Sequence, residues 1–328
     1  MSVLLESPPM AIAPEASTIA CPCGSETLDV VGSCRDTAQR TISREERDQL
    51  GGIDSGTLYR CRSCSLGFRF PQPSPEALAS LYGSMDSERW VDDVTQSHAW
   101  NRVWKLLADG RSSRGRILDV GAFTGGFLEQ IPRSWDRAAI EPSSQARQIL
   151  RKHGIDVVGE LLASPSPELR AAFDIVTLFD VFEHLHAPIE SMRWLQEMVR
   201  PGGRLILSTG NMDHWTWHML RGEHWYLDPA QHLCFGSESF FRDWAQRNGL
   251  RVTHLETIPH GQRSAKQVLI QSLSTLYFAG RQRNTLGARV SRRLLHAIPP
   301  IGRLKHKAHP PYTRSLRDHL LIVFEVPA

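Results

Sequence analysis

The sequence predicts an α/β protein whose main domain is a doubly wound parallel sheet, preceded by a small cysteine-rich unit. Between residues 116 and 258, short apolar runs alternate with helix-like segments. This alternation favours parallel strands that are covered by helices on both faces. The first of these runs passes through a glycine-rich turn into the next segment, as at a ligand-binding strand end. Five of the six cysteines lie before residue 65.

The length, composition and charge of the chain are those of an ordinary globular protein. Its 328 residues can bury a large core in more than one unit, and 41% of them are hydrophobic. A net charge of +3 favours no particular partner. The first residues lack the basic start and apolar stretch of a secretory signal, and no run approaches the ~20 apolar residues of a membrane-spanning helix. We therefore expect a cytoplasmic protein, with residues 1–18 as a disordered tail.

The cysteines indicate a metal site in an N-terminal unit that we place at residues 19–85. They form two close pairs, Cys-Pro-Cys and Cys-Arg-Ser-Cys, which are far apart in the sequence. In a reducing compartment, such thiolate pairs favour a tetrahedral zinc site over disulfides. The four ligands would be Cys21, Cys23, Cys61 and Cys64. The first pair is one residue shorter than the usual Cys-x-x-Cys, so Cys34 is an alternative ligand, and unligated apolar cysteines are the alternative interpretation.

The other elements follow in order along the chain. Ser74-Pro75 is typical of a helix start and predicts a helix over residues 76–82. Trp100, Val103 and Trp104 recur on one helical face and predict a helix over residues 93–109. Strands are expected over residues 116–120, 137–140, 155–158, 175–179, 204–208, 251–258 and 319–326. Further helices are expected over residues 127–131, 144–153, 188–199 and 237–248.

Three motifs mark the ends of the expected strands. The first is Asp119-Val-Gly-Ala-Phe-Thr-Gly-Gly126, in which glycines let a ligand approach the backbone. Glu141 ends the second apolar run, and Asp180-Val-Phe-Glu-His-Leu185 follows the fourth. In this order the motifs resemble those of the class I S-adenosylmethionine (SAM) dependent methyltransferases. An NAD-binding Rossmann domain is the alternative, but it requires Gly-x-Gly-x-x-Gly where this chain has Gly-x-x-x-Gly-Gly.

The resemblance implies a seven-stranded Rossmann-like methyltransferase sheet. Its strand order would be 3-2-1-4-5-7-6, with an antiparallel seventh strand. The SAM-binding core would occupy residues 86–258, and residues 318–328 would add the final strand after a helical insertion over residues 259–317. The cysteine unit in front is also similar to that of zinc-containing bacterial methyltransferases that act on small molecules and sugars.

The resemblance also implies which residues bind SAM. The turn after the first strand would contact the methionine part of SAM through Asp119, Gly121, Ala122, Phe123 and Gly125. Glu141 would accept hydrogen bonds from both ribose hydroxyls. Glu160 would bind the adenine amino group, and Asp180 would lie beside the methionine. Many relatives carry glycine at the position of Phe123, so this chain departs from the pattern there.

Three histidines are candidates for a catalytic base. Methyl transfer from a sulfonium needs alignment and, for some acceptors, proton removal, which imidazole performs near neutral pH. His184 follows the fourth strand, and His224 and His232 follow the fifth. The alternative for each is a capping or packing role. The aromatic residues over 211–226 favour an acceptor pocket and core packing equally.

The insertion over residues 259–317 is strongly basic, since none of residues 257–317 is acidic. An apolar stripe from Leu286 to Ile298 recurs at helical spacing beside arginines such as Arg289. A basic amphipathic helix of this kind binds an anionic membrane, the phosphates of a substrate, or RNA. A solvated face with its apolar side packed on the core is the remaining alternative. We expect the membrane surface, which would place the protein at the inner face of the membrane.

Together these patterns predict a SAM-dependent methyltransferase that acts on a small or lipid-linked acceptor, with a saccharide as one option. SAM and zinc are the expected cofactors. A zinc-containing RNA methyltransferase and a non-catalytic SAM-fold binding protein are the alternatives, although the modest net charge does not favour nucleic acid as the partner. The sequence leaves open whether the methylated atom is oxygen, nitrogen or carbon.

Overall fold

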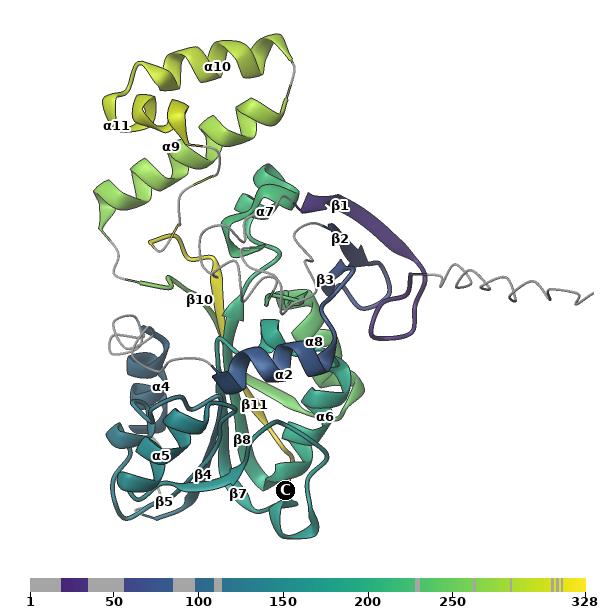
Figure 1. Cartoon of the computed structure of the whole chain (residues 1–328), viewed down its shortest axis with the longest axis vertical. Coiled ribbons are helices and arrows are strands. Elements are labelled where there is room, and N and C mark those ends of the chain that lie inside the picture. Colours follow the sequence, from purple (N-terminus) through teal and green to yellow (C-terminus); the bar gives the residue numbers. More distant parts are fainter. Residues whose placement is uncertain are drawn as a thin grey trace, which may run out of the picture.

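The computed structural model describes residues 19–34, 56–84, 98–108, 114–227, 231–261, 264–283, 285–307, 310, 313 and 315–328. The expected tail over residues 1–18 and the start of the helix expected over 93–109 lie outside these ranges. The described residues form a large sheet with flanking helices, a small sheet beside it, and a helical arm that stands off at one end (Figure 1).

The large sheet has seven strands in the order β10-β11-β8-β7-β4-β5-β6. Neighbours from β8 to β6 run parallel, and β11 is antiparallel to both β8 and β10. The strands are β4 (Arg116–Val120), β5 (Asp136–Ile140), β6 (Asp156–Gly159), β7 (Phe173–Phe179), β8 (Val199–Gly210), β10 (Arg251–Ile258) and β11 (His319–Glu325). This confirms the expected order with its antiparallel last strand.

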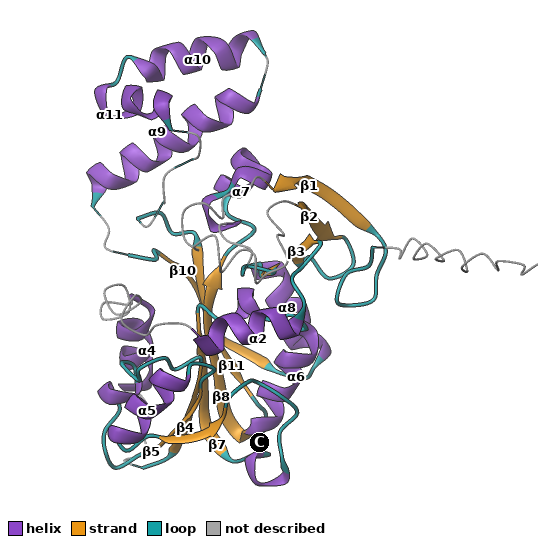
Figure 2. Ribbon diagram, in the orientation of Figure 1, coloured by secondary structure: helices purple, strands orange, loops and turns teal. Residues whose placement is uncertain are grey.

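Helices cover both faces of the large sheet (Figure 2). The face with α4 (His98–Ala108) and α5 (Ser144–Lys152) has its own buried core, which includes Val103 and Leu150. The opposite face carries α6 (Pro188–Met198) and α8 (Glu238–Arg247), which pack the second core. Because the central strands are buried on both faces, they are continuous apolar runs in the sequence.

The helix expected over residues 127–131 is instead a single 3-10 turn, Leu128–Gln130. Pro132 follows at once and disfavours the helical conformation in the residue before it. Ile131 is accordingly extended, with φ −78° and ψ 132°. The apolar residues of this segment are buried, so their spacing reflects burial in the core and not a long helix.

The cysteine-rich unit forms a four-stranded antiparallel sheet in the order β1-β2-β3-β9. The first three strands are β1 (Leu28–Cys34), β2 (Gly56–Cys61) and β3 (Gly67–Phe70). The fourth, β9 (Cys234–Phe235), comes from the segment after β8, so the small sheet is shared with the main body. The helix α2 (Pro75–Ser84) follows, and the Ser74 hydroxyl caps it by accepting from the Ala77 amide at 3.2 Å.

The insertion before β11 is a helical arm, as the sequence predicts (Figure 1). Its helices are α9 (Ala265–Gln282), α10 (Leu286–His296) and α11 (Pro299–Gly302), and a 3-10 turn, Arg303–His306, follows them. The arm contacts the body at α7 (Trp215–Leu220), where Leu220 packs with Tyr277 and Phe278. The Gln282 amide also donates to the Leu220 carbonyl at 3.2 Å.

We predict that Leu321→Ala, in the middle of β11, lowers the free energy of unfolding by about 2–5 kcal/mol. Leu321 is 0% exposed and belongs to the core under α4 and α5, so its truncation leaves a cavity. The matched control is Leu161→Ala, whose side chain is 51% exposed and whose truncation we expect to cost about 0.5 kcal/mol or less. Urea unfolding measures both, and equal losses would contradict the packing assigned to β11.

Candidate functional site

The four cysteines named as zinc ligands come together: Cys21 and Cys23 precede β1, Cys61 ends β2, and Cys64 lies in the turn from β2 to β3. Cys21 Sγ lies 3.6 Å from Cys64 Sγ, and Cys23 Sγ lies 3.6 Å from Cys61 Sγ. All four sulfur atoms lie within 4.8 Å of one another. Tetrahedral zinc with bonds of about 2.3 Å holds sulfur atoms about 3.8 Å apart, so the cluster fits this ion.

The other two cysteines lie elsewhere. Cys34, the alternative ligand, is buried at the end of β1 among Leu58 and Trp217, outside the four-sulfur cluster. Burial raises the pKa of its thiol. Cys234 is buried in β9 and donates to the Phe182 carbonyl at 3.1 Å, so it has the core role that a lone cysteine most often has.

The turn after β4 adopts left-handed backbone conformations. Gly121 has φ +72°, Phe123 has φ +50° and Gly125 has φ +89°. A Cβ atom at Gly121 would lie 2.4 Å from the Val181 side chain, so only glycine fits against the segment after β7. Phe123 takes a left-handed conformation that favours glycine, which costs free energy in a non-glycine residue.

Glu141, at the end of β5, holds this turn in place. One carboxylate oxygen accepts from the Phe123 amide at 2.7 Å, and the other accepts from the Ser143 amide at 2.8 Å. The side chain is 4% exposed. Burial raises its pKa, while the two amides and Arg147 act in the opposite direction. Each oxygen keeps a second lone pair, so the carboxylate can still accept from a ligand.

Two further acids lie at this edge of the sheet. Asp119 is buried in β4 and accepts from the Thr177 hydroxyl at 2.6 Å, and burial raises its pKa to about 7. Ala122 is buried in the turn that follows. Glu160, after β6, has a side chain that is 72% exposed and pairs with Arg147 at 2.9 Å.

Asp180 follows β7 and also has a left-handed backbone, with φ +51°. Its side chain is 38% exposed and lies beside the turn after β4, since Val181 is the neighbour of Gly121. Desolvation raises the pKa of Asp180 to about 7, and the charge of Glu183 adds to this. A strained residue with a shifted pKa at a strand end is typical of a functional position.

His184 and His232 lie together with Glu183, their rings 4.7 Å apart. His184 Nδ1 lies 2.9 Å from the Tyr82 hydroxyl, and the Tyr226 carbonyl accepts from His232 Nδ1 at 2.6 Å. Burial lowers the pKa of each imidazole to about 4, so both are neutral at pH 7. Glu183 is buried and accepts from Tyr226 and Thr209, so its two oxygens already have donors.

His224 is a packed residue. It is 1% exposed and stacks on Trp217 at 3.9 Å. Its Nδ1 accepts from the Tyr226 amide, so in the neutral ring Nε2 donates to the Thr216 hydroxyl at 2.9 Å. Burial lowers its pKa to about 3. Both nitrogens have protein partners, and the neighbouring aromatic residues Trp217, Trp225 and Tyr226 are buried as well.

A second polar group at the same edge, made of His319 and His260, was not predicted from the sequence. His319 begins β11, is 2% exposed, and its Nδ1 donates to Asp318 at 3.0 Å. Burial lowers the pKa of His319, but the hydrogen bond and charge of Asp318 outweigh it, with Asp180 adding, and the net shift is upward. His260, after β10, lies 3.8 Å from Asp180. In the sequence, the one signal for His260 and His319 is that each stands at or next to the end of an expected strand.

Comparison with known proteins agrees with this arrangement. A family model described as a methyltransferase domain matches residues 94–255. The chain is 26% identical to the ubiquinone biosynthesis O-methyltransferase of Photorhabdus laumondii subsp. laumondii over 193 residues, which span 55% of this chain and 80% of that protein. It is 29% identical to the protein of that name from Aeromonas salmonicida over 146 residues, which span 42% of this chain and 59% of that protein.

Among solved structures, an S-adenosylmethionine dependent methyltransferase from Mesorhizobium loti aligns with 72% of this chain and 99% of its own, at 14% identity and a TM-score of 0.44. The family match covers the segment that contains the turn after β4, Glu141 and Asp180. The large sheet also has the strand order expected of the class I enzymes. The chain therefore belongs, through residues 94–255, to the SAM-dependent methyltransferases.

Proposed function

We propose that this methyltransferase transfers a methyl group to a hydroxyl of a small, lipid-linked acceptor, with SAM bound at the ends of β4, β5 and β7. The observation that carries the proposal is the left-handed turn after β4, which is tied to the buried carboxylate of Glu141. The free lone pairs of Glu141 suit the two ribose hydroxyls of SAM. Asp180 then lies beside the methionine end.

The chemical step needs few groups from the protein. The acceptor oxygen attacks the methyl carbon, the carbon–sulfur bond of SAM breaks, S-adenosylhomocysteine leaves, and the hydroxyl proton passes to a base or to water. Of the three histidines predicted as bases, His184 and His232 lie near the strand ends and are neutral. With pKa values of about 4 they are weak bases, and His224 is enclosed by its packing partners.

Two observations support a hydroxyl on a lipid-linked acceptor. The curated relatives named above are ubiquinone biosynthesis O-methyltransferases by name. The arm exposes apolar side chains: Leu286 is 72% exposed, Leu294 is 69% exposed and none of the residues of α10 is buried. Such a surface favours contact with lipid over a saccharide in solution.

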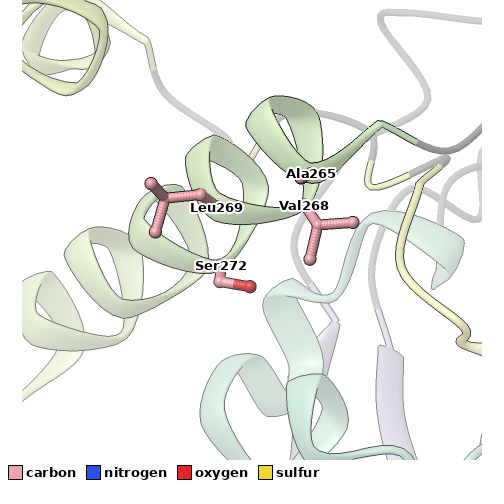
Figure 3. A pocket seen from close by; sticks show the side chains of 4 residues that line it. All are labelled: Ala265, Val268, Leu269 and Ser272. Atoms are coloured by element: carbon pink, nitrogen blue, oxygen red, sulfur yellow. The ribbon is translucent and has the colours of Figure 1, made fainter.

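The arm also carries a shallow hollow on the first turns of α9, lined by Ala265, Val268, Leu269 and Ser272 (Figure 3). Leu269 is 60% exposed there. None of the described helices is both long and apolar enough to cross a membrane. We propose that the exposed apolar side chains of the arm lie on a bilayer surface, with its arginines reaching anionic headgroups.

We predict that Glu141→Gln weakens SAM binding by about 2–4 kcal/mol, which is roughly 30- to 1,000-fold in Kd. The change removes the negative charge that accepts hydrogen bonds from the two amides and, in the proposed complex, from the ribose hydroxyls. Calorimetry with SAM measures the change in affinity, and Glu190→Gln, at an exposed carboxylate on α6, is the control.

The acceptor is tested with methyl-labelled SAM and fractionated bacterial extract. Label should enter the lipid fraction with the native chain and not with Glu141→Gln. Label in RNA, or unchanged affinity in Glu141→Gln, would contradict the proposal.

We predict that the purified protein contains about one zinc ion per chain, bound by Cys21, Cys23, Cys61 and Cys64. Cys61→Ser should lose the zinc and lower the stability of the N-terminal unit, because a structural zinc ion supplies folding free energy. Cys34→Ser, outside the cluster, should retain the metal. Elemental analysis decides this, and zinc retained in Cys61→Ser or lost in Cys34→Ser would disprove the ligand set.

We predict that the arm binds anionic vesicles and that the body of the enzyme does not. Replacing Arg289, Arg292 and Arg293 by Glu should abolish binding in vesicle flotation, because each arginine contributes on the order of 1 kcal/mol at an anionic surface. Three exposed basic residues of the body, Arg133, Lys152 and Arg193, replaced by Glu are the charge-matched control. Equal flotation with neutral and anionic vesicles would refute the membrane assignment and leave a phosphorylated soluble acceptor as the role for these arginines.

A further inference from the structure

Asp180, which lies beside the methionine end in the proposed SAM site, also forms a group with two histidines that the proposed reaction has not used. Asp180 follows β7, His260 follows β10 and His319 begins β11. One ligand atom from each lies within 4.8 Å of the others, and His260 Nε2 lies 3.8 Å from Asp180 Oδ2. The rings of His260 and His319 have centroids 4.8 Å apart.

The orientation of His319 is fixed, which leaves one nitrogen for a ligand. Nδ1 donates to Asp318 at 3.0 Å, so in the neutral ring Nε2 carries the lone pair. Nε2 is buried and, within the described part of the chain, has no hydrogen-bond partner. A buried nitrogen without a partner is costly unless something else binds it.

Asp318 in turn has its own fixed position. Its second oxygen accepts from the Thr313 hydroxyl at 2.9 Å and from Trp225 Nε1 at 3.3 Å. A carboxylate that holds the far nitrogen of a histidine is the common arrangement behind a metal-bound imidazole, where it fixes the ring and increases its basicity. Asp318 and His319 have this relation.

The local charge also favours a cation. Asp180, Glu183 and Asp318 place three carboxyl groups around His319. Among the described residues, the ion-pair partners recorded for Asp180 and Asp318 are histidines. These carboxyl groups would attract a metal ion to the unpartnered Nε2 of His319.

The neighbouring cluster of Glu183, His184 and His232 is different. Its carboxylate oxygens accept from Tyr226 and Thr209, and both histidines have partners at Nδ1. Protein contacts therefore account for the orientation of that cluster without a metal ion.

We propose that Asp180, His260 and His319 bind a divalent first-row transition-metal ion, with Asp318 as the residue that positions His319. One carboxylate oxygen and two imidazole nitrogens suit Mn²⁺, Fe²⁺, Co²⁺ or Zn²⁺. Bonds of about 2.1 Å place adjacent ligand atoms about 3 Å apart, so the ligands close inward on the ion.

The role of the ion rests on the proposed function. A metal ion at this point would bind the acceptor oxygen beside the methyl group of SAM and make its hydroxyl more acidic, so that the proton passes to water. The metal ion would thereby promote the loss of the hydroxyl proton, for which His184 and His232 are weak bases.

The test measures Mn²⁺ binding to the full chain by electron paramagnetic resonance. The cysteine cluster is first loaded with one equivalent of zinc, and dialysis against a mild chelator then removes metal from weaker sites, because zinc left there would compete with Mn²⁺. The native chain should bind one Mn²⁺. His260→Ala and Asp180→Asn should each weaken binding at least tenfold. His319→Gln should also weaken Mn²⁺ binding at least tenfold. If this buried variant fails to fold, His260→Ala and Asp180→Asn alone test the site.

Two controls should bind as the native chain does: His232→Ala, in the neighbouring cluster, and His153→Ala, a surface histidine paired with Glu129. No Mn²⁺ binding, unchanged binding in His260→Ala and Asp180→Asn, or loss confined to His232→Ala would overturn the proposal. Calorimetry with SAM on the same samples tests the proposed function separately, because Mn²⁺ binding by the unliganded chain requires neither SAM nor acceptor.

Discussion

The candidate site depends on one buried carboxylate. Glu141 accepts from the amide of Phe123 in the turn after β4 and from the amide of Ser143, which caps α5. It therefore joins two strand ends and a helix start through a single side chain. Because the group is buried, its charged form depends on these donors, and the left-handed conformation of Phe123 depends on Glu141 in return. The shape of the turn is thus set before any ligand binds.

The large sheet could be predicted because its strands are buried on both faces and so form unbroken apolar runs, as in residues 116–120 and 319–325. Their spatial order came from the family resemblance, since the runs themselves do not specify neighbours. The turn Leu128–Gln130 was wrongly expected to be a helix because buried apolar residues in a tight turn have helical spacing. The strand β9 was missed because two residues carry no periodicity.

The site residues could be predicted where an acidic residue stands directly after an apolar run. Glu141 and Asp180 stand directly after apolar runs, so their place at a strand end could be read from the sequence. His260 and His319 approach Asp180 only through the pairing of β10 with β11, which no local pattern reveals. His224 had the residue type of a base, but its burial against Trp217 is a tertiary property. Residue type alone does not distinguish a reactive imidazole from a packed one.

The pairing of β3 with β9 links the thiol chemistry of the protein to its acceptor side. Phe68 lies opposite Cys234 in this pair, and the amide of the adjoining Leu233 donates to the Glu183 carbonyl at 2.7 Å. An oxidant that converts Cys61 and Cys64 to a disulfide would disturb the sheet that β9 completes, two residues from His232. The turn after β4 and Glu141 lie on other strands and would keep their contacts. A disturbance that begins at the cysteine cluster would therefore reach the neighbourhood of His232 through β9 before it reaches the turn after β4.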